Sequence, residues 1–150
     1  VVSASRRRRK RRFMTPNWSN WSGRLTADAE LVHVRSEDDV ARRVAAAEPG
    51  STIRVAGRSH SHMPLIPNDD TIVDTSGLNG IISTNVDDQT AWIWAGTPIA
   101  ALGATLHAAG LALKNQGDID RQTIAGACPL YTADAAGDSV RVGESGCRTF

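Results

Sequence analysis

The clearest pattern of hydrophobic and polar positions lies a short way into the chain and predicts a helix. Ser36 stands in the N-cap position, and Asp39 follows at the spacing of a capping box. Val40 and Val44 fall on one helical face, so the segment has an apolar side to bury. A Pro-Gly pair ends the pattern, because neither residue continues a helix.

Four short segments downstream predict β-strands. The run at 52–57 (TIRVAG) predicts a buried strand that breaks at its glycine, and 71–74 (TIVD) predicts a second strand. The segments 81–86 (IISTNV) and 90–96 (TAWIWAG) are separated by three polar residues, which predicts a hairpin.

A second helix is predicted directly after this hairpin. Thr97 is the expected N-cap, Pro98 suits the first helical position, and Gly110 stands at the C′ position. The apolar stripe between them consists of Ile99, Leu102 and Leu106. The following residues, 111–127, have the glycine-punctuated composition of a loop.

The predicted order is helix, strand, strand, hairpin, helix, which indicates an α+β fold with short strands. It lacks the regular alternation of strand and helix that a doubly wound sheet requires. Two familiar nucleotide-binding signatures are also absent from the sequence. Neither GxGxxG after the strand at 52–57 nor GxxxxGK[ST] occurs, so a bound nucleotide would need a different loop.

The net charge of +1 conceals an uneven distribution. Residues 6–12 (RRRRKRR) hold seven of the 17 basic residues, and the other ten face 16 acidic residues. The basic run is a candidate nucleic-acid or nuclear-import segment. Met14 follows it closely, and we expect translation to begin there, with residues 1–13 as read-through of upstream sequence. The acidic remainder gives no electrostatic reason to expect nucleic acid.

The cysteines and the hydropathy exclude several classes of protein. Cys128 and Cys147 have no CxxC spacing, so neither a zinc site nor a disulfide framework is indicated, and no metal is expected. No run approaches the roughly 18 apolar residues of a transmembrane helix. Reduced thiols in a cytoplasmic protein are the simplest interpretation, with peripheral membrane association left open.

The stretch VAGRSHSH at 55–62 carries the most chemistry. An exposed polar loop is one interpretation, and a ligand-binding loop is the other. A glycine directly after a strand lets the backbone turn sharply and approach a ligand closely. Successive N–H groups in such a turn can bind a pyrophosphate. The candidate residues are Ala56, Gly57, Arg58, Ser59, His60 and Ser61.

Five pieces of the chain, in order, resemble a known family. They are NWSNWSG at 17–23, Gly-x-x-His-Ser at 57–61, VDTSGLNGI at 73–81, LGATLHAAGLALKNQGDID at 102–120 and GDID-x-Q-x-I-A-G-A at 117–127. Together they resemble the FAD-binding domain of the vanillyl-alcohol oxidase / p-cresol methylhydroxylase (PCMH) superfamily. Within it, they are most similar to the L-gulonolactone and D-arabinono-1,4-lactone oxidases, with alditol oxidases nearby. The resemblance implies the N-terminal α/β subdomain of a PCMH-type FAD-binding domain, truncated.

The resemblance implies FAD as the cofactor and assigns roles to two loops. His60 matches the histidine that the family's oxidases join covalently to the 8α-methyl group of the flavin. His62 has no counterpart, and Ser59 stands where many members have glycine. The second loop is expected to lie against the cofactor through Gly117, Asp118, Gln122, Thr123 and Gly126.

Other chemically suggestive residues have plainer interpretations. Trp92 and Trp94 are expected to pack rather than to form a flavin platform, and His33 and His107 to lie at the surface. Asp120, with its neighbour Asp118, resembles an acid/base pair, but the family motif favours cofactor contact for this loop.

The resemblance implies three regions and an activity. Residues 1–13 form the basic leader, 14–127 the partial FAD-binding subdomain, and 128–150 an aberrant tail for which we hypothesise a frameshift near residue 128. The implied reaction is hydride transfer from a sugar-1,4-lactone or alditol to FAD, followed by reoxidation by oxygen or another acceptor. The catalytic base is expected downstream, so the chain alone is expected to be incomplete and inactive. The alternatives are a small nucleic-acid-associated protein using 6–12 and a flavin-binding module without catalysis.

Overall fold

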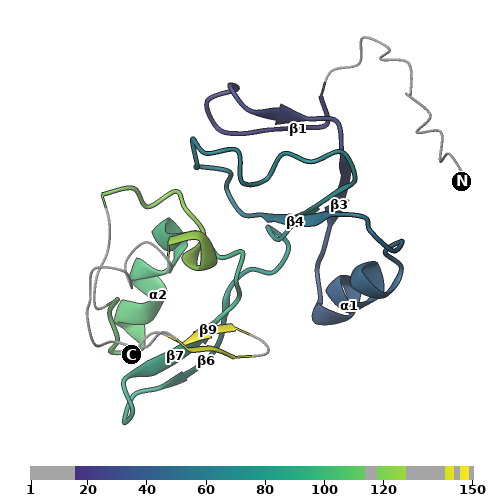
Figure 1. The fold of residues 1–150 in the computed structure, drawn as a ribbon. Coiled ribbons are helices and arrows are strands. Elements are labelled where there is room, and N and C mark those ends of the chain that lie inside the picture. The colour runs from purple at the N-terminus through teal and green to yellow at the C-terminus, as the bar shows by residue number, and fades with distance from the viewer. Residues whose placement is uncertain (1–15, 114–117, 128–140, 144–145, 149–150) are drawn as a thin grey trace, which may run out of the picture.

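The computed structural model describes residues 16–113 and 118–127, together with the backbone of 141–143 and 146–148. Two groups of strands, each with one helix, lie side by side (Figure 1). The first group comprises β1 (Trp18–Ser19), β2 (Thr26–Ala27), β3 (Glu30–His33), α1 (Glu37–Ala45), β4 (Ile53–Ala56) and β5 (Thr71–Asp74). The second comprises β6 (Ile81–Asn85), β7 (Thr90–Ile93), a 3₁₀ turn η1 (Ile99–Ala101), α2 (Gly103–Ala108), β8 (Arg141–Gly143) and β9 (Gly146–Arg148).

The first group is built around a parallel three-stranded sheet of order β3-β5-β4. Helix α1 connects β3 to β4, so these three elements form a βαβ crossover of the kind parallel strands require. One hydrophobic cluster joins the sheet to the β1–β2 pair through buried residues such as Trp18 and Ile72. Another joins it to α1 through Val34 and Val73, with Val40 packed against them.

Helix α1 begins where the sequence predicts. The Ser36 hydroxyl accepts a hydrogen bond from the Asp39 backbone N–H at 3.1 Å, and the Asp39 carboxylate accepts one from the Ser36 N–H at 3.1 Å. The predicted capping box is therefore confirmed. The same carboxylate also accepts from the Arg35 N–H at 2.9 Å, and this bond lowers the pKa of Asp39.

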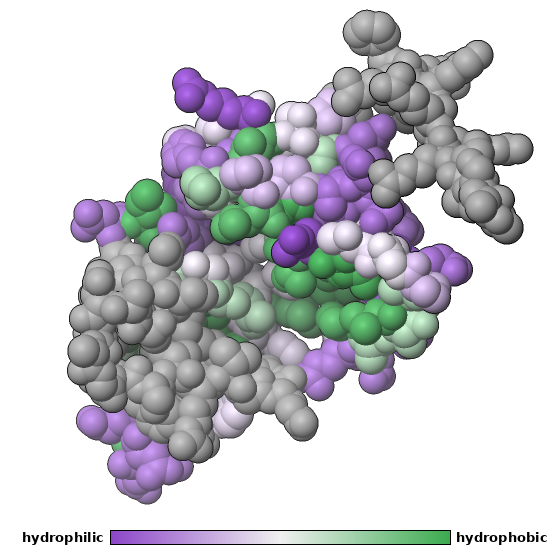
Figure 2. Space-filling view, viewed as in Figure 1, coloured by the Kyte–Doolittle hydropathy of each residue, from purple (hydrophilic) through white to green (hydrophobic). Residues whose placement is uncertain are grey.

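Strand β4 was expected to be buried, and this expectation is wrong. Val55 is 61% exposed, and of the four residues of β4 only Ala56 is buried. The reason is that β4 lies at one edge of its sheet, where it pairs only with β5. Val44 of α1 is also 56% exposed, and Figure 2 shows hydrophobic residues gathered over α1 and the adjoining part of the sheet.

The second group confirms the predicted hairpin. Strands β6 and β7 pair antiparallel, with a register irregularity between Ile81 and Ser83. Strand β9 pairs with β7, and β8 with β9, giving the order β6-β7-β9-β8. The hairpin packs on η1 and α2 through a cluster that contains Ile93, Leu102 and Leu106. The hypothesis that 128–150 is an aberrant tail stays a prediction.

The second helix begins differently from the prediction. Its first turn is the 3₁₀ segment η1, and Thr97 does not cap it. The Thr97 hydroxyl instead donates to the Trp94 carbonyl at 2.7 Å and accepts from the Gly80 N–H at 2.9 Å. This side chain is engaged by the preceding turn, which explains why the N-cap prediction fails.

The predicted apolar stripe and helix end are both confirmed. Ile99, Leu102 and Leu106 are all buried. Gly110 follows α2 with a φ of +75°, a conformation that favours glycine. Its N–H donates to the His107 carbonyl at 3.0 Å, and the Leu111 N–H donates to the Leu106 carbonyl at 2.8 Å. These two bonds form a Schellman motif.

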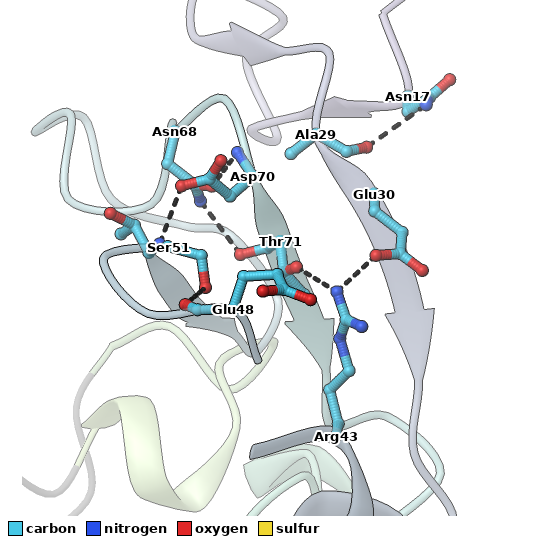
Figure 3. Close-up of polar contacts among 10 residues, drawn as sticks. Asn17, Ala29, Glu30, Arg43, Glu48, Ser51, Asn68, Asp70 and Thr71 are labelled. Carbon is cyan, nitrogen blue, oxygen red and sulfur yellow. Dashed lines mark hydrogen bonds and ion pairs between the residues drawn. The ribbon is translucent and has the colours of Figure 1, made fainter. Parts of the chain in front are cut away.

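Polar contacts tie the N-terminal end of the parallel sheet together (Figure 3). The Arg43 guanidinium on α1 contacts both Glu30 of β3 and Thr71 of β5. The Asn68 amide donates to the Thr71 carbonyl at 3.1 Å, and the Asp70 carboxylate accepts from the Thr52 N–H at 2.7 Å. This end of the sheet is therefore stabilised structurally, and the opposite end carries the loop of interest. No helix in the described ranges is long and apolar enough to cross a membrane.

Candidate functional site

The candidate loop leaves the C-terminal edge of the parallel sheet. The strand register aligns His33, Asp74 and Ala56, the last residues of β3, β5 and β4. The Ala56 carbonyl accepts bonds from both the backbone N–H and the hydroxyl of Thr75, at 3.1 and 3.2 Å. Gly57 then begins the loop, at the edge where open α/β sheets bind ligands.

The N-terminal segment holds this loop in place. The Trp21 N–H donates to the Ser59 carbonyl at 3.1 Å, and the Asn20 side-chain amide donates to the Ser61 carbonyl at 3.1 Å. The indole N–H of the buried Trp18 donates to the Ser59 hydroxyl at 3.1 Å. The motif at 17–23 thus supports the loop directly, a role that the sequence alone did not reveal.

Ser59 adopts a left-handed backbone conformation, with a φ of +56°. This explains why glycine is common at the matching family position. A non-glycine residue in this region costs about 1–2 kcal/mol. The two hydrogen bonds that Ser59 accepts contribute about 1 kcal/mol each and offset this cost.

The two histidines of the loop both contact Trp21. The His60 ring stacks on the indole, with centroids 5.4 Å apart and an interplanar angle of 14°. The His62 ring meets the same indole at 5.3 Å and 72°, in an edge arrangement. His60 is partly buried, whereas His62 is exposed. The loop thus presents two imidazoles of different orientation around one aromatic side chain.

The second predicted loop lies directly against the first. A Cβ added at Gly57 would lie 2.4 Å from the Thr123 hydroxyl oxygen, so only glycine permits the observed approach. Thr123 is buried, and its hydroxyl accepts from the Gly126 N–H at 3.3 Å. The structure therefore brings the two candidate loops together, although 65 residues separate Gly57 from Thr123 in the sequence.

The second loop is fixed by its neighbour η1. The Ile124 N–H donates to the Thr97 carbonyl at 2.8 Å, and the Ile99 N–H donates to the Gln122 carbonyl at 2.9 Å. The Ala100 N–H donates to the Asp120 carbonyl at 2.8 Å. These bonds make the loop a rigid extension of the second group.

The polar groups at the junction fit a nucleotide cofactor. Within the part of the chain that the structure describes, the backbone N–H groups of Arg58, Ser59 and His60 donate to no protein group. Consecutive free donors of this kind are suited to a phosphate. The Gln122 side-chain oxygen is buried and has no hydrogen-bond partner among the described residues, so it can accept from a ligand donor.

The remaining candidate residues that the structure describes are mostly exposed. Arg58, Asp118 and Gly126 are exposed, and Gly117 lies outside the described residues. Asp120 is exposed too, and its carbonyl serves the loop structurally. No cluster of potential metal ligands occurs within 16–113 and 118–127.

The structure also places the two tryptophans of the hairpin segment and the two histidines outside the loop. Trp94 packs against a core cluster, as expected, and Trp92 is partly buried. His107 is exposed on α2, and His33 is exposed at the end of β3. The His33 imidazole also pairs with the Asp74 carboxylate at 2.9 Å. No signal in the sequence indicated this pair, because β3 itself was not predicted.

Comparisons with known proteins agree with this geometry. Residues 29–129 match the family described as "FAD binding domain". The chain is 34% identical over 121 residues to an L-gulono-1,4-lactone dehydrogenase of Mycobacterium tuberculosis, covering 79% of this chain and 28% of that protein. It is 36% identical over 115 residues to a D-arabinono-1,4-lactone oxidase of Eremothecium gossypii, covering 73% and 22%. The chain thus spans about a quarter of the length of the curated relatives it matches.

Solved structures share the fold. A cholesterol oxidase from B. sterolicum superposes with a TM-score of 0.63 and 27% identity, over 73% of this chain and 22% of that one. An alkyldihydroxyacetonephosphate synthase superposes with a TM-score of 0.62 and 21% identity, over 70% and 21%. The second likeness concerns the fold alone. The mixed helix and strand fold class expected from the sequence is confirmed.

Proposed function

Because the chain belongs to the FAD-binding domain family, we propose that it is the cofactor-binding part of a flavoprotein that oxidises a sugar-1,4-lactone or a related alditol. The family and the FAD cofactor predicted from the sequence are confirmed. The observation that carries the proposal is the junction of the two loops at Gly57 and Thr123. Bound FAD would supply the redox chemistry, by accepting a hydride from the substrate carbon.

The first loop would hold the pyrophosphate of the cofactor. The free N–H groups of Arg58, Ser59 and His60 are the donors, and the exposed Arg58 guanidinium adds positive charge. The approach of Gly57 to Thr123 keeps this loop close to the second one. Gln122 would contribute its unpartnered oxygen to a donor of the cofactor.

His60 is the residue that we propose for a covalent bond to the flavin. It is partly buried against Trp21 within the loop, whereas His62 is exposed. A covalent bond would retain the cofactor and tune its potential. Ala56, Ser61, Asp118 and Gly126 complete the proposed cofactor contacts.

The substrate class rests on the relatives. One acts, by its name, on L-gulono-1,4-lactone and another on D-arabinono-1,4-lactone. Both names describe the oxidation of a sugar lactone. For this chain we propose the same class of reaction, with oxygen or another electron acceptor regenerating the cofactor. The base that takes the substrate's hydroxyl proton is not assigned to any described residue.

Three measurements test the proposal. Titration of the apoprotein with FAD, followed by flavin fluorescence, should show saturable binding that Gly57→Val abolishes, because valine cannot fit against Thr123. After acid denaturation, the wild type and His62→Ala should retain flavin, whereas His60→Ala should release it. Retention by His60→Ala would show that the proposed linkage site is wrong. Lactone-dependent flavin reduction, tested with gulono- and arabinono-lactones and with alditols, would identify the substrate class.

A further inference from the structure

Trp21 is an exposed aromatic side chain at the edge of the proposed cofactor loop. It is 56% exposed, yet its ring contacts both His60 and His62. Its backbone N–H also donates to the Ser59 carbonyl, in the middle of the loop. Burial therefore does not explain the residue, and its two ring contacts suggest a role in the site.

We propose that Trp21 is a positioning residue that fixes the ring plane of His60 and so determines which histidine bonds to the flavin. The proposal rests on the covalent bond proposed above. It adds the residue that selects between two histidines separated by Ser61.

The geometry shows how the selection would work. In a stacked pair the indole covers a face of the imidazole, while both ring nitrogens stay at the free edge. Among the described residues, no hydrogen bond orients the His60 nitrogens, so the stack is what fixes the ring. His62 meets the same indole at 72°, so its plane cannot be parallel to that of His60. The two imidazoles therefore lie in different planes, so a methyl carbon placed in the plane of the His60 ring generally lies out of the plane of the His62 ring.

The bond itself balances with dioxygen as the oxidant. An imidazole nitrogen of His60 bonds to the 8α-methyl carbon, the imidazole N–H and one methyl C–H bond break, and two electrons and two protons reduce dioxygen to hydrogen peroxide. Holding the ring changes how often the nitrogen faces the methyl carbon. The free energy of an aromatic contact of this kind corresponds to a factor of about two to ten in the population of the oriented His60 ring.

The first experiment uses the protein without FAD. Diethyl pyrocarbonate modifies accessible imidazoles, and mass spectrometry can follow His60, His62 and the exposed reference His107 in the same sample. In Trp21→Ala the indole no longer covers one face of the imidazole or holds its plane, so the reagent can approach the nitrogens from both sides, and we expect His60 to react about two to ten times faster relative to His107. Trp21→Phe should stay near the wild-type rate, because a phenyl ring can still stack. An unchanged His60 rate in Trp21→Ala would overturn the proposal.

The second experiment adds FAD to the apoproteins and follows acid-stable flavin with time. Trp21→Ala should acquire flavin more slowly than the wild type, and peptide mapping should find part of it on His62. Trp21→Phe should restore both the rate and the attachment at His60. Wild-type rate with attachment only at His60 in Trp21→Ala would refute the positioning role. If the wild type acquires no acid-stable flavin, the covalent bond proposed above fails, while the modification rates still decide whether Trp21 orients His60.

Discussion

The contact between Gly57 and Thr123 yields the sharpest prediction about how the two loops meet. Gly57→Ala adds a methyl group whose carbon would lie 2.4 Å from the Thr123 hydroxyl oxygen and 3.3 Å from its methyl carbon. Thr123 is 3% exposed and has little room to move. Forcing an extra methyl into a packed site costs about 1–3 kcal/mol, so we expect this loss in the free energy of unfolding.

The second perturbation removes the obstacle. Thr123→Ala deletes both nearest atoms and leaves only the Thr123 Cβ, at 3.4 Å from the added carbon, which is an ordinary contact. Alone, this substitution loses the bond from the Gly126 N–H, at about 1 kcal/mol. In the double variant the added methyl should therefore cost little. We expect the two effects to fall short of additivity by about 1–3 kcal/mol.

Equilibrium urea unfolding of the four proteins in this double-mutant cycle measures the coupling. The FAD affinity of each, from fluorescence titration, shows whether the same contact shapes the cofactor loop. A Gly110→Ala variant is a useful control, since its φ of +75° makes the substitution costly without any nearby atom. Its effect should be additive with Thr123→Ala. Additivity of Gly57→Ala and Thr123→Ala within about 0.5 kcal/mol would refute the proposed contact.

Three further predictions concern the loop support and helix α1. Ser59→Ala keeps the left-handed φ but leaves the buried Trp18 indole N–H without its acceptor, so urea unfolding should show a loss of about 1–2 kcal/mol. Ser59→Gly removes the strain of the left-handed backbone, so its loss in the free energy of unfolding should be smaller. A larger loss for Ser59→Gly than for Ser59→Ala would contradict this account. Ser36→Ala should cost about 1 kcal/mol in the same assay, with Ser36→Thr as the conservative control. The hydrogen bond from the Arg35 N–H lowers the pKa of Asp39 below its ordinary 3.8. The stabilisation by the Asp39 carboxylate is therefore present above pH 3.8 and is lost as the pH falls through the lowered pKa. Stability should therefore fall more steeply below pH 3.8 in the wild type than in Asp39→Asn, and parallel curves would argue against it.

Local signals in the sequence were sufficient for several elements. The capping box of α1, the strand at 71–74 and the glycine at the end of α2 all depend on residues close together in the chain. The apolar face predicted for α1 is only partly right, because Val40 packs against the core whereas Val44 is exposed. The predicted N-cap role of Thr97 failed for the opposite reason. Its hydroxyl is engaged by Gly80, seventeen positions earlier, and the sequence carries no local sign of that contact.

The candidate site was predictable only in part. The two loops could be identified separately, by a glycine after a strand and by the matched motif, but their contact depends on how the two groups of strands pack. Strand β3 was missed because ELVH is short and lacks clear alternation, and with it the His33–Asp74 pair. The exposure of Val55 was likewise unpredictable, since an apolar residue in a strand does not reveal whether that strand is central or at an edge.

The support of the cofactor loop has a consequence for the order in which the protein folds. The bond between Trp18 and Ser59 joins residues 41 positions apart, and the approach of Gly57 to Thr123 spans an even longer stretch. Contacts of this range form slowly, because closing a long loop costs entropy before the contact forms. During synthesis the loop emerges well before Thr123. We therefore expect it to be among the first segments made and among the last to reach its final shape.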